Sequence, residues 1–375
     1  MDTGRVGDLD LRRKRPVGQT FLQPLEKFEF FLRIHLAYHT RILHNAYAMR
    51  FVDLFSGAGL FSCGFQQAGF MPVLAIDLAK DAIASYNRNV VDVCICGSVS
   101  ELESLPDCEV LIAGPPCQGF STLGRRDPLD ERNALALEVA RLAESNPPEI
   151  VVIENVPPFL KSAAWSELSA RLEAAGYTVG TWVLDAADHG TAQHRTRAFT
   201  VASRVGGVIR PSPDGIVISA GEMIAKPIDA DDPMHRWPMP SDLALARMTI
   251  IPPRGDKRDL MNVAPDMCPP SWTVVGCQAT DVWGRIDPAK PVNTLRCAFQ
   301  NPSKGRYIHP VENRVLSLRE GARLQGVPDD WVFEGRNYPV ARQIGNGVPV
   351  PLARAVAEEV MRALLAARNN RSKAA

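Results

Sequence analysis

The sequence predicts an α/β protein whose mostly parallel sheet is covered by helices on both faces. Short apolar strands alternate with amphipathic helices from Phe51 onward, and the strands are continuously apolar, as strands buried on both faces are. After about Val205 proline and glycine become frequent and the periodicity fades. We therefore expect an α/β lobe followed by a smaller, irregular lobe of strands and loops.

Seven strands account for the first lobe. They are expected at 50–55, 71–78, 92–99, 108–116, 149–156, 177–186 and 197–204, with helices at 60–69, 81–89 and 133–145 between them. Two later helices are expected at 317–326 and 349–370. The second has a proline near its start and should pack back onto the first lobe.

Four segments follow from this pattern: 1–48 as an N-terminal extension, 49–205 as the α/β domain, 206–338 as the irregular domain and 339–375 as a returning segment. The extension fits an extra helix packed on the first lobe, or a start codon assigned too early, because Met49 directly precedes a strand. A nucleic-acid-binding arm is the less favoured interpretation. The helical face would be Phe28, Phe31, His35, Tyr38, Ile42 and Ala46, and the arm would use Arg12, Arg13, Lys14 and Arg15.

The composition is that of an ordinary soluble protein. Among 375 residues, 42 basic side chains balance 42 acidic ones. A net charge of zero neither supports nor excludes a locally basic cleft. We find no apolar run long enough for a bilayer and no signal peptide, so we expect a cytoplasmic protein without a membrane partner. The eight cysteines include no CxxC pair, so we expect free thiols and no metal site.

The first strand leads into the turn DLFSGAGLFSCGF, which runs from Asp53 to Phe65. Gly57 and Gly59 would let the backbone turn tightly and approach a ligand at the helix N-terminus. Ser62 stands where the third glycine of the dinucleotide fingerprint belongs, which favours a smaller adenosine-bearing ligand. Asp77 ends the second strand and could bind both ribose hydroxyls. Each signal alone also fits a plain tight turn.

The fourth and fifth strands end in GPPCQGFS and ENV. Both ends belong to the edge where open α/β sheets build their sites. A Cys117 thiolate and a Glu154 carboxyl side by side suit addition to an electron-poor ring, with the acid bound to a ring nitrogen. Glu154 would need a raised pKa to donate a proton. The alternatives are a small core residue at Cys117 and a buried structural carboxylate at Glu154.

Six motifs appear in order: DLFSGAG, PPCQGFS, ENV, QHRTR, SLREGARLQGVPDDW and QIGNGVPVPLARAV. From Phe51 to about Val356 they resemble the motif set of bacterial-type DNA (cytosine-5) methyltransferases. The resemblance implies a Rossmann-like fold that uses S-adenosyl-L-methionine and releases S-adenosyl-L-homocysteine. It also implies that the irregular domain recognises the DNA target.

The resemblance assigns roles residue by residue. Cys117 matches the nucleophile that adds to cytosine carbon 6, and Glu154 matches the carboxyl that holds ring nitrogen 3. Arg195 and Arg197 match the pair near the flipped base and its phosphate, although structural ion pairs are the alternative for both. The positions that match the cofactor site are Phe55, Ser56, Gly57, Gly59, Leu60, Asp77, Leu78, Ser98, Val99, Pro116, Asn346 and Val348.

DNA contacts are expected from the catalytic loop and from the irregular domain. For each basic residue taken singly, a solvated surface charge is the better interpretation. The candidates are Gln118, Ser121, Arg125, Arg126, Gln193, Arg285 and Arg296, with Lys257, Arg258, Lys304 and Arg306 as further cations.

Three residues depart from the family pattern: Ser98 where aspartate is frequent, Leu60 where glycine is usual, and Ala192 where proline is usual. None removes a catalytic group, so we expect an active monomer that methylates double-stranded DNA. A restriction–modification role with a separate endonuclease and an orphan epigenetic role both fit. An RNA (tRNA) cytosine-5 methyltransferase and a catalytically silent relative are the alternatives, and the QGFS motif argues against the tRNA branch.

Overall fold

The computed structural model describes residues 48–116, 135–275 and 281–374. Its first lobe is built on a seven-stranded sheet in the order β3-β2-β1-β4-β5-β7-β6. The strands are β1 (Arg50–Leu54), β2 (Met71–Asp77), β3 (Cys94–Cys96), β4 (Val110–Ala113), β5 (Ile150–Asn155), β6 (Thr178–Asp185) and β7 (Thr196–Ser203). All seven predicted strands are therefore present, although β3 is shorter than expected.

Neighbours from β3 to β5 pair in parallel, whereas β7 pairs antiparallel with both β5 and β6. The predicted mostly parallel sheet is confirmed. Because β1, β2, β4 and β5 run the same way, their carboxyl ends meet at one edge, where β1 continues into the glycine turn and β4 into Gly114. This edge brings the predicted site segments together.

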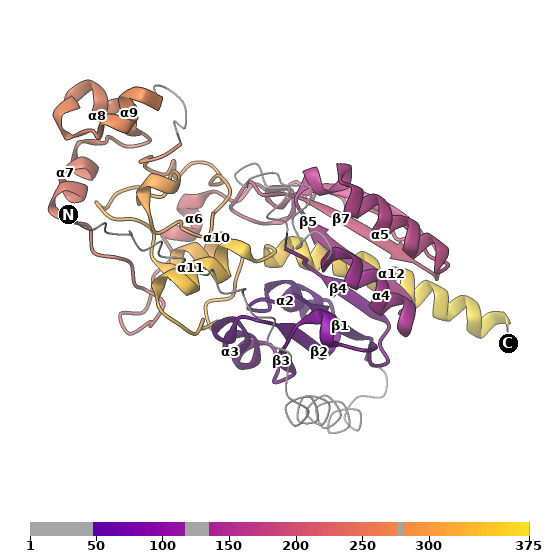
Figure 1. Cartoon of the computed structure of the whole chain (residues 1–375). Helices are drawn as coiled ribbons and strands as arrows, with labels where there is room; N and C mark the ends of the chain where they lie inside the picture. Colours follow the sequence, from indigo (N-terminus) through magenta and orange to yellow (C-terminus); the bar gives the residue numbers. More distant parts are fainter. Residues whose placement is uncertain (1–47, 117–134, 276–280, 375) are drawn as a thin grey trace, which may run out of the picture.

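The central strands β1, β4 and β5 send alternate side chains into two different cores, which explains their continuously apolar sequences. Val52, Leu111 and Val151 pack with α4 (Leu135–Ser145) and α5 (Ala163–Ala174). Phe51 and Val110 belong to the opposite core, with α2 (Leu60–Gln67) and α12 (Val350–Ala374). Helix α3 (Lys80–Asn89) packs against β2 and β3. Figure 1 shows these layers.

Helix α12 packs back onto the first lobe. Leu352, Val356 and Val360 are buried against the α2 face of the sheet, as the amphipathic pattern indicated. Helix α5 was not among the expected elements, and its apolar positions Leu168 and Leu172 complete the other core.

The second lobe corrects one prediction. We expected strands and loops, but its described residues hold short helices, and their only pairing is through isolated bridges such as Arg285↔Ile308. Figure 1 shows α7, α8 and α9 at the far end of this lobe and α10 and α11 next to the sheet. The helices are α6 (Ala220–Ile224), α7 (Asp242–Ile250), α8 (Lys257–Val263), α9 (Pro270–Val275), α10 (Leu318–Leu324) and α11 (Asn337–Asn346).

A shared core joins the two lobes. The predicted helix in SLREGARLQG is present as α10, and its Leu318 and Leu324 are fully buried. They pack in one cluster with Ile344 of α11 and with Leu60, the first residue of α2. The second lobe is thus packed directly against the helix that follows the glycine turn.

Candidate active site

The turn after β1 has the conformation that its glycines predicted. Gly57 and Gly59 have φ angles of 53° and 88°, and Phe55 has a φ of 59°, which is unusual for a bulky residue. A Cβ on Gly59 would lie 2.6 Å from Val90 Cγ2, so glycine is required there for packing as well. A Cβ on Gly57 would meet nothing within 4 Å, so this side of the turn faces open space.

Asp77 closes the turn from β2. Its Oδ2 accepts a hydrogen bond from Gly57 N at 2.8 Å and its Oδ1 accepts one from Ala79 N at 2.8 Å. Each oxygen keeps a second lone pair, so the carboxylate can still accept from a diol. Beside it, the Leu78 side chain is 70% exposed and offers an apolar surface.

The third strand ends in a small cap. Ser98 accepts a hydrogen bond from Ser100 N and forms a capping box with Glu101, while Val99 is buried in the core. Ser98 thus organises the chain after β3, and Val99 anchors it.

A buried polar chain below the turn was missed by the sequence analysis. Ser62 Oγ donates to Asp53 Oδ2 at 2.6 Å and lies 2.8 Å from Tyr86 Oη. Burial raises the pKa of Asp53 to about 8, with the charge of Asp77 adding to the rise and the Ser62 hydrogen bond opposing it. The sequence analysis considered Ser62 only as a replacement for the third glycine of the dinucleotide fingerprint. In the structure, the Ser62 hydroxyl connects the Asp53 carboxyl to the Tyr86 hydroxyl.

Glu154 lies at the carboxyl end of β5, opposite the chain that leads to Cys117. Gly114 N donates to Leu54 O, and Asn155 Nδ2 donates to Pro115 O at 3.3 Å, which fixes the path of residues 114–116. A Cβ on Gly114 would be 3.9 Å from Glu154 Oε2. Pro116 is the last described residue before the gap. The predicted Cys117, Gln118, Ser121, Arg125 and Arg126 lie outside the described residues.

Glu154 forms an ion pair with Arg197 of β7. Arg197 Nε lies 2.8 Å from Glu154 Oε1, and the two side chains are only 14% and 12% exposed. Burial raises the pKa of Glu154, and the charges of Arg197 and Arg195 oppose this only in part. A raised pKa favours the protonated form of this carboxyl, which is the form that can donate a proton.

Arg195 differs from Arg197 in what it contacts. Its Nη1 donates to Leu295 O at 3.0 Å and its Nη2 to Gly345 O at 2.7 Å, and the side chain is buried. Gln193 is equally buried, accepts from Leu295 N and donates to Leu324 O. Gln193 therefore binds the backbone of the second lobe, which corrects the prediction that Gln193 contacts DNA. Arg195 connects its own segment to the segments that contain Leu295 and Gly345.

The last predicted cofactor segment lies beside the turn. A Cβ on Gly347 would be 2.4 Å from Leu60 Cδ2, so the chain after α11 passes directly over the start of α2. Asn346 Oδ1 accepts from Cys297 Sγ at 2.7 Å, and Val348 is buried in the α2–α12 core. The structure thus brings together the turn, Asp77, Glu154 and the end of α11.

Arg285 and Arg296, both predicted to bind DNA, differ in exposure and in their contacts. Arg285 is 4% exposed, and its guanidinium donates to the carbonyls of Met248, Ile251, His309 and Glu312. Arg285 is therefore a structural residue, which corrects that prediction. Arg296 is 38% exposed, pairs with Asp281 at 3.1 Å and remains accessible.

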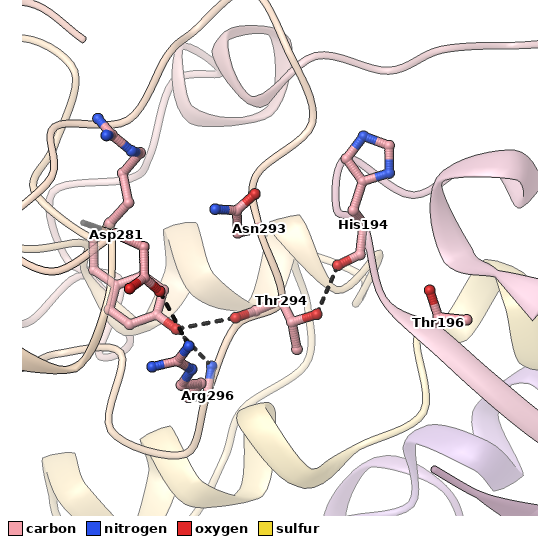
Figure 2. A pocket seen from close by; sticks show the side chains of 8 residues that line it. His194, Thr196, Asp281, Asn293, Thr294 and Arg296 are labelled. Carbon is pink, nitrogen blue, oxygen red and sulfur yellow. Dashed lines mark hydrogen bonds and ion pairs between the residues drawn. The ribbon is translucent and has the colours of Figure 1, made fainter. Parts of the chain in front are cut away.

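Arg296 lines a pocket of about 350 Å³ between the lobes. Figure 2 shows His194 and Thr196 on one wall and Asn293, Thr294 and Arg296 across from them. The other lining residues are Asp281, Arg306 and Tyr307. Thr196, which lines this pocket, directly precedes Arg197 of the ion pair with Glu154 in the chain.

Comparisons with known proteins show the family of this chain. A model of the C-5 cytosine-specific DNA methylase family matches residues 49–225 and 272–362. The Type II methyltransferase M1.HphI of Haemophilus parahaemolyticus is 31% identical over 359 residues, covering 89% of this chain and 90% of that protein. The Type II methyltransferase M.Eco47II of Escherichia coli is 31% identical over 363 residues, covering 92% and 85%.

Two solved structures share the fold. A prophage-encoded DNA modification methyltransferase from E. coli superposes with a TM-score of 0.63 at 24% identity, covering 85% of this chain and 100% of that one. The S. pombe Dnmt2 methyltransferase gives a TM-score of 0.59 at 19% identity, covering 85% and 98%. The fold is therefore that of the Rossmann-like methyltransferases.

The chain belongs to the C-5 cytosine-specific DNA methylase family and is a DNA cytosine-5 methyltransferase. Methyltransferases of this family take their methyl group from S-adenosyl-L-methionine. Among the described residues, no helix is long and apolar enough to cross a membrane. Within the same residues, no cluster of three or more His, Cys, Asp or Glu side chains is arranged for a metal ion.

Proposed function

We propose that this chain methylates cytosine in duplex DNA with Cys117 as nucleophile and Glu154 as the acid that holds the ring. The observation that carries the proposal is the place of Glu154. It is buried, has a raised pKa, is paired with Arg197, and lies against the strand end that leads into Cys117.

The cofactor residues fit an adenosyl ligand. The turn is open at Gly57, Asp77 keeps acceptor capacity for a ribose diol, and exposed Leu78 lies next to it. We assign Phe55, Ser56, Gly59, Leu60, Ser98, Val99, Pro116, Asn346 and Val348 to the rest of this site. When bound there, S-adenosyl-L-methionine supplies the methyl group.

A base inside a duplex is hidden from the protein, so the target cytosine must be flipped out. Protonated Glu154 then donates to ring nitrogen 3 while the Cys117 thiolate adds to carbon 6, which makes carbon 5 nucleophilic. After methylation, the proton leaves carbon 5 and the bond from carbon 6 to sulfur breaks. Arg197 holds Glu154 in place and lies near the base. Gln118, Ser121, Arg125, Arg126 and Arg296 remain proposed DNA contacts.

We further propose that residues 49–205 form the catalytic domain, that 206–338 form the target-recognition domain and that 339–375 return to the first. We propose that the chain acts as a monomer, because flipping a single base out of the duplex does not require two symmetric subunits. The relatives named as Type II methyltransferases favour a restriction–modification role with a separate endonuclease.

The test is base-resolution bisulfite sequencing of DNA from a host that lacks its own cytosine methylation. Cells express the wild-type chain, Cys117→Ala or Glu154→Gln. We expect protected cytosines within one short sequence for the wild type and none for Cys117→Ala. Absence of protection with soluble wild-type protein would contradict the proposal, and methylation of tRNA in its place would support the RNA alternative.

A further inference from the structure

The chain leaves strand β4 through two consecutive prolines. The parallel ladder between β4 and β5 ends at Ala113, and Gly114 N then donates to Leu54 O of β1. Pro115 and Pro116 have no backbone N–H, so neither can donate a ladder hydrogen bond to β5. After Ala113, a hydrogen bond that ties this chain to β5 therefore has to be donated from β5.

Asn155, the last residue of β5, makes that hydrogen bond with its side chain. Its Nδ2 donates to Pro115 O at 3.3 Å, and its Oδ1 accepts from Val156 N at 2.8 Å. Because the amide oxygen can only accept and the amide nitrogen can only donate, these two partners fix which end of the side chain faces Pro115. Asn155 is only 4% exposed, so the contact is shielded from water.

Asn155 and Glu154 are neighbours on β5 with separate contacts. Glu154 pairs with Arg197, and a Cβ on Gly114 would lie 3.9 Å from Glu154 Oε2. Asn155 contacts the next residue of the same chain, Pro115. A change at Asn155 thus alters how the chain after β4 is held beside Glu154, while the carboxyl and its ion pair stay in place.

We propose that Asn155 is a positioning residue for methyl transfer, whose amide holds the Pro115 carbonyl so that the chain leading to Cys117 leaves β4 at a fixed distance from Glu154. The inference rests on the proposed function, because its effect is exerted through Cys117 as the nucleophile. Asn155 belongs to the ENV motif, in which the sequence analysis gave a role to Glu154 alone. Misplacing a reacting group by about 1 Å is enough to slow a reaction roughly 10²-fold.

The test replaces the donor and keeps the shape of the side chain. Asn155→Asp keeps an oxygen for Val156 N but places a second oxygen against Pro115 O. An ionised carboxylate there repels the carbonyl, whereas a protonated carboxyl donates to it. Burial and the neighbouring Glu154 both favour the protonated form. The hydrogen bond to Pro115 is therefore made at low pH and lost as the pH rises.

The charged groups around this position come from three elements. Glu154 precedes it on β5, Arg197 and Arg195 oppose the burial of Glu154, and η3 (Pro157–Lys161) ends in a lysine. From residue 110 to residue 116, β4 and its extension carry no titratable side chain. Glu154, the arginines and the lysine are present in the wild type as well, so each rate of a variant is divided by the wild-type rate at the same pH.

The readout is a covalent adduct with duplex DNA that carries fluorine at carbon 5 of the target cytosine. The Cys117 sulfur adds to carbon 6, and carbon 5 takes the methyl group from S-adenosyl-L-methionine. No proton is then left on carbon 5, so the bond between sulfur and carbon 6 does not break. Denaturing gels follow the adduct over time. Asn146→Asp is the matched control, because Asn146 Nδ2 also donates to a backbone carbonyl, Leu105 O, at 3.1 Å but lies before the amino end of β5.

We expect the rate ratio of Asn155→Asp to fall by roughly 10²-fold from low to high pH, while Asn146→Asp follows the wild type at every pH. The dissociation constants for S-adenosyl-L-homocysteine and for duplex DNA, measured by calorimetry, should equal those of the wild type, because the substitution leaves the cofactor turn unchanged. The loss is thus expected in the rate and not in binding.

The inference is overturned if Asn155→Asp forms the adduct at the wild-type rate throughout the pH range, or if its loss of rate does not depend on pH. It is also overturned if the affinity for S-adenosyl-L-homocysteine and the unfolding midpoint fall together with the rate, which would make Asn155 a purely structural residue. Failure of the proposed function is a different result, since the wild-type chain itself would then form no adduct.

Discussion

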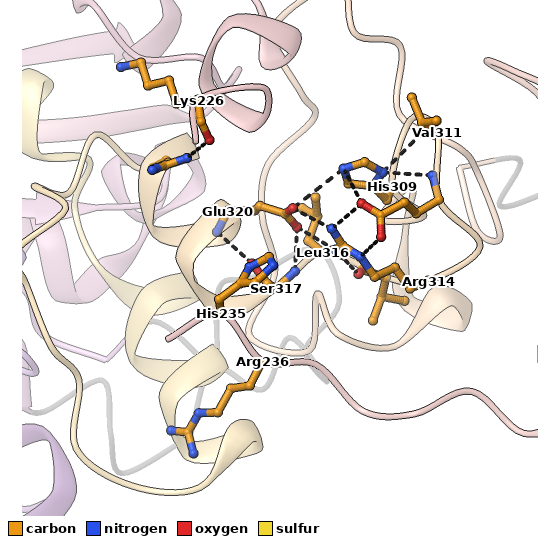
Figure 3. A network of polar contacts seen from close by, with 12 residues as sticks. Lys226, His235, Arg236, His309, Val311, Arg314, Leu316, Ser317 and Glu320 are labelled. Atoms are coloured by element: carbon orange, nitrogen blue, oxygen red, sulfur yellow. Dashed lines mark hydrogen bonds and ion pairs between the residues drawn. The ribbon is translucent and has the colours of Figure 1, made fainter. Parts of the chain in front are cut away.

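The molecule contains two buried Glu–Arg pairs that behave in opposite ways. Glu320, at the start of α10, accepts from both Nη1 and Nη2 of Arg314 at 2.8 Å and from Ser317 N at 2.7 Å. Figure 3 shows this network, which also includes His309. Glu154 in the active site has one ion-pair contact, to Arg197 Nε.

The pKa directions follow from this difference. Burial alone would raise the pKa of Glu320, but the hydrogen bonds and charge of Arg314 outweigh burial and lower it. For Glu154 burial prevails and the pKa is raised. The Glu320 carboxylate, whose oxygens already accept several hydrogen bonds, stabilises the second lobe. The Glu154 carboxyl has fewer partners and can still form a hydrogen bond with a substrate. The comparison separates structural from catalytic use of the same residue pair.

The largest effect is expected at the catalytic pair. Glu154→Gln should lower kcat by roughly 10²–10⁴-fold, the usual contribution of a general acid, with little change in unfolding free energy. Glu109→Gln is the matched control, since Glu109 also pairs with an arginine, Arg50, but at the amino end of the sheet. Single-turnover methylation kinetics check this, and equal kcat for both variants would remove Glu154 from the mechanism.

The second-largest effect is expected at the structural pair, Glu320 and Arg314, and on stability rather than on activity. Glu320→Gln should lower the free energy of unfolding by about 1.5–3 kcal/mol, because it removes the buried carboxylate that accepts two hydrogen bonds from the Arg314 guanidinium. Glu312→Gln removes a more exposed partner of the same arginine and should cost less than about 1 kcal/mol. Urea unfolding measures both. Similar midpoints would mean that the network does not stabilise the lobe.

The third effect is a pH dependence that arises below the cofactor turn. Asp53 has a pKa of about 8 when folded and about 3.8 as its ordinary value, so between these pH values the folded chain holds a proton that the unfolded chain has lost. Stability from this group is therefore lost as pH rises, by at most about 1.4 kcal/mol per pH unit. Asp53→Asn should flatten the slope between pH 5 and pH 8 in urea unfolding. A variant with an unchanged slope would contradict the raised pKa.

The smallest effect distinguishes the two arginines of QHRTR. Arg195→Lys should lower the free energy of unfolding by about 2 kcal/mol, because lysine cannot reach Leu295 O and Gly345 O together. Arg197→Lys should lower kcat at nearly unchanged stability. Thermal melts and methylation assays on the two variants check this, and interchanged phenotypes would reverse the assignment.

Much of the first lobe was predictable because a two-faced parallel sheet imposes continuous apolar runs. The second lobe was not, since helices such as α6 and α8 are too short to show a period. Their start signals were nevertheless in the sequence: Ser219 with Glu222 and Asp256 with Asp259 form capping boxes. A capping residue followed three positions later by an acidic residue was a usable signal for helices where strands were expected.

The sequence by itself determined the order of strands and helices in the first lobe, the glycine turn, the family motifs and the position of Glu154 at a strand end. These depend on local pattern and on residue type. Only the tertiary structure decided that Arg195, Gln193 and Arg285 are buried and bound to distant backbone groups. In contrast, Arg197 and Arg296 each form an ion pair with an acidic side chain. The physical reason is that an arginine's role depends on which acceptors surround it, and those acceptors come from segments as much as 150 residues away in the chain.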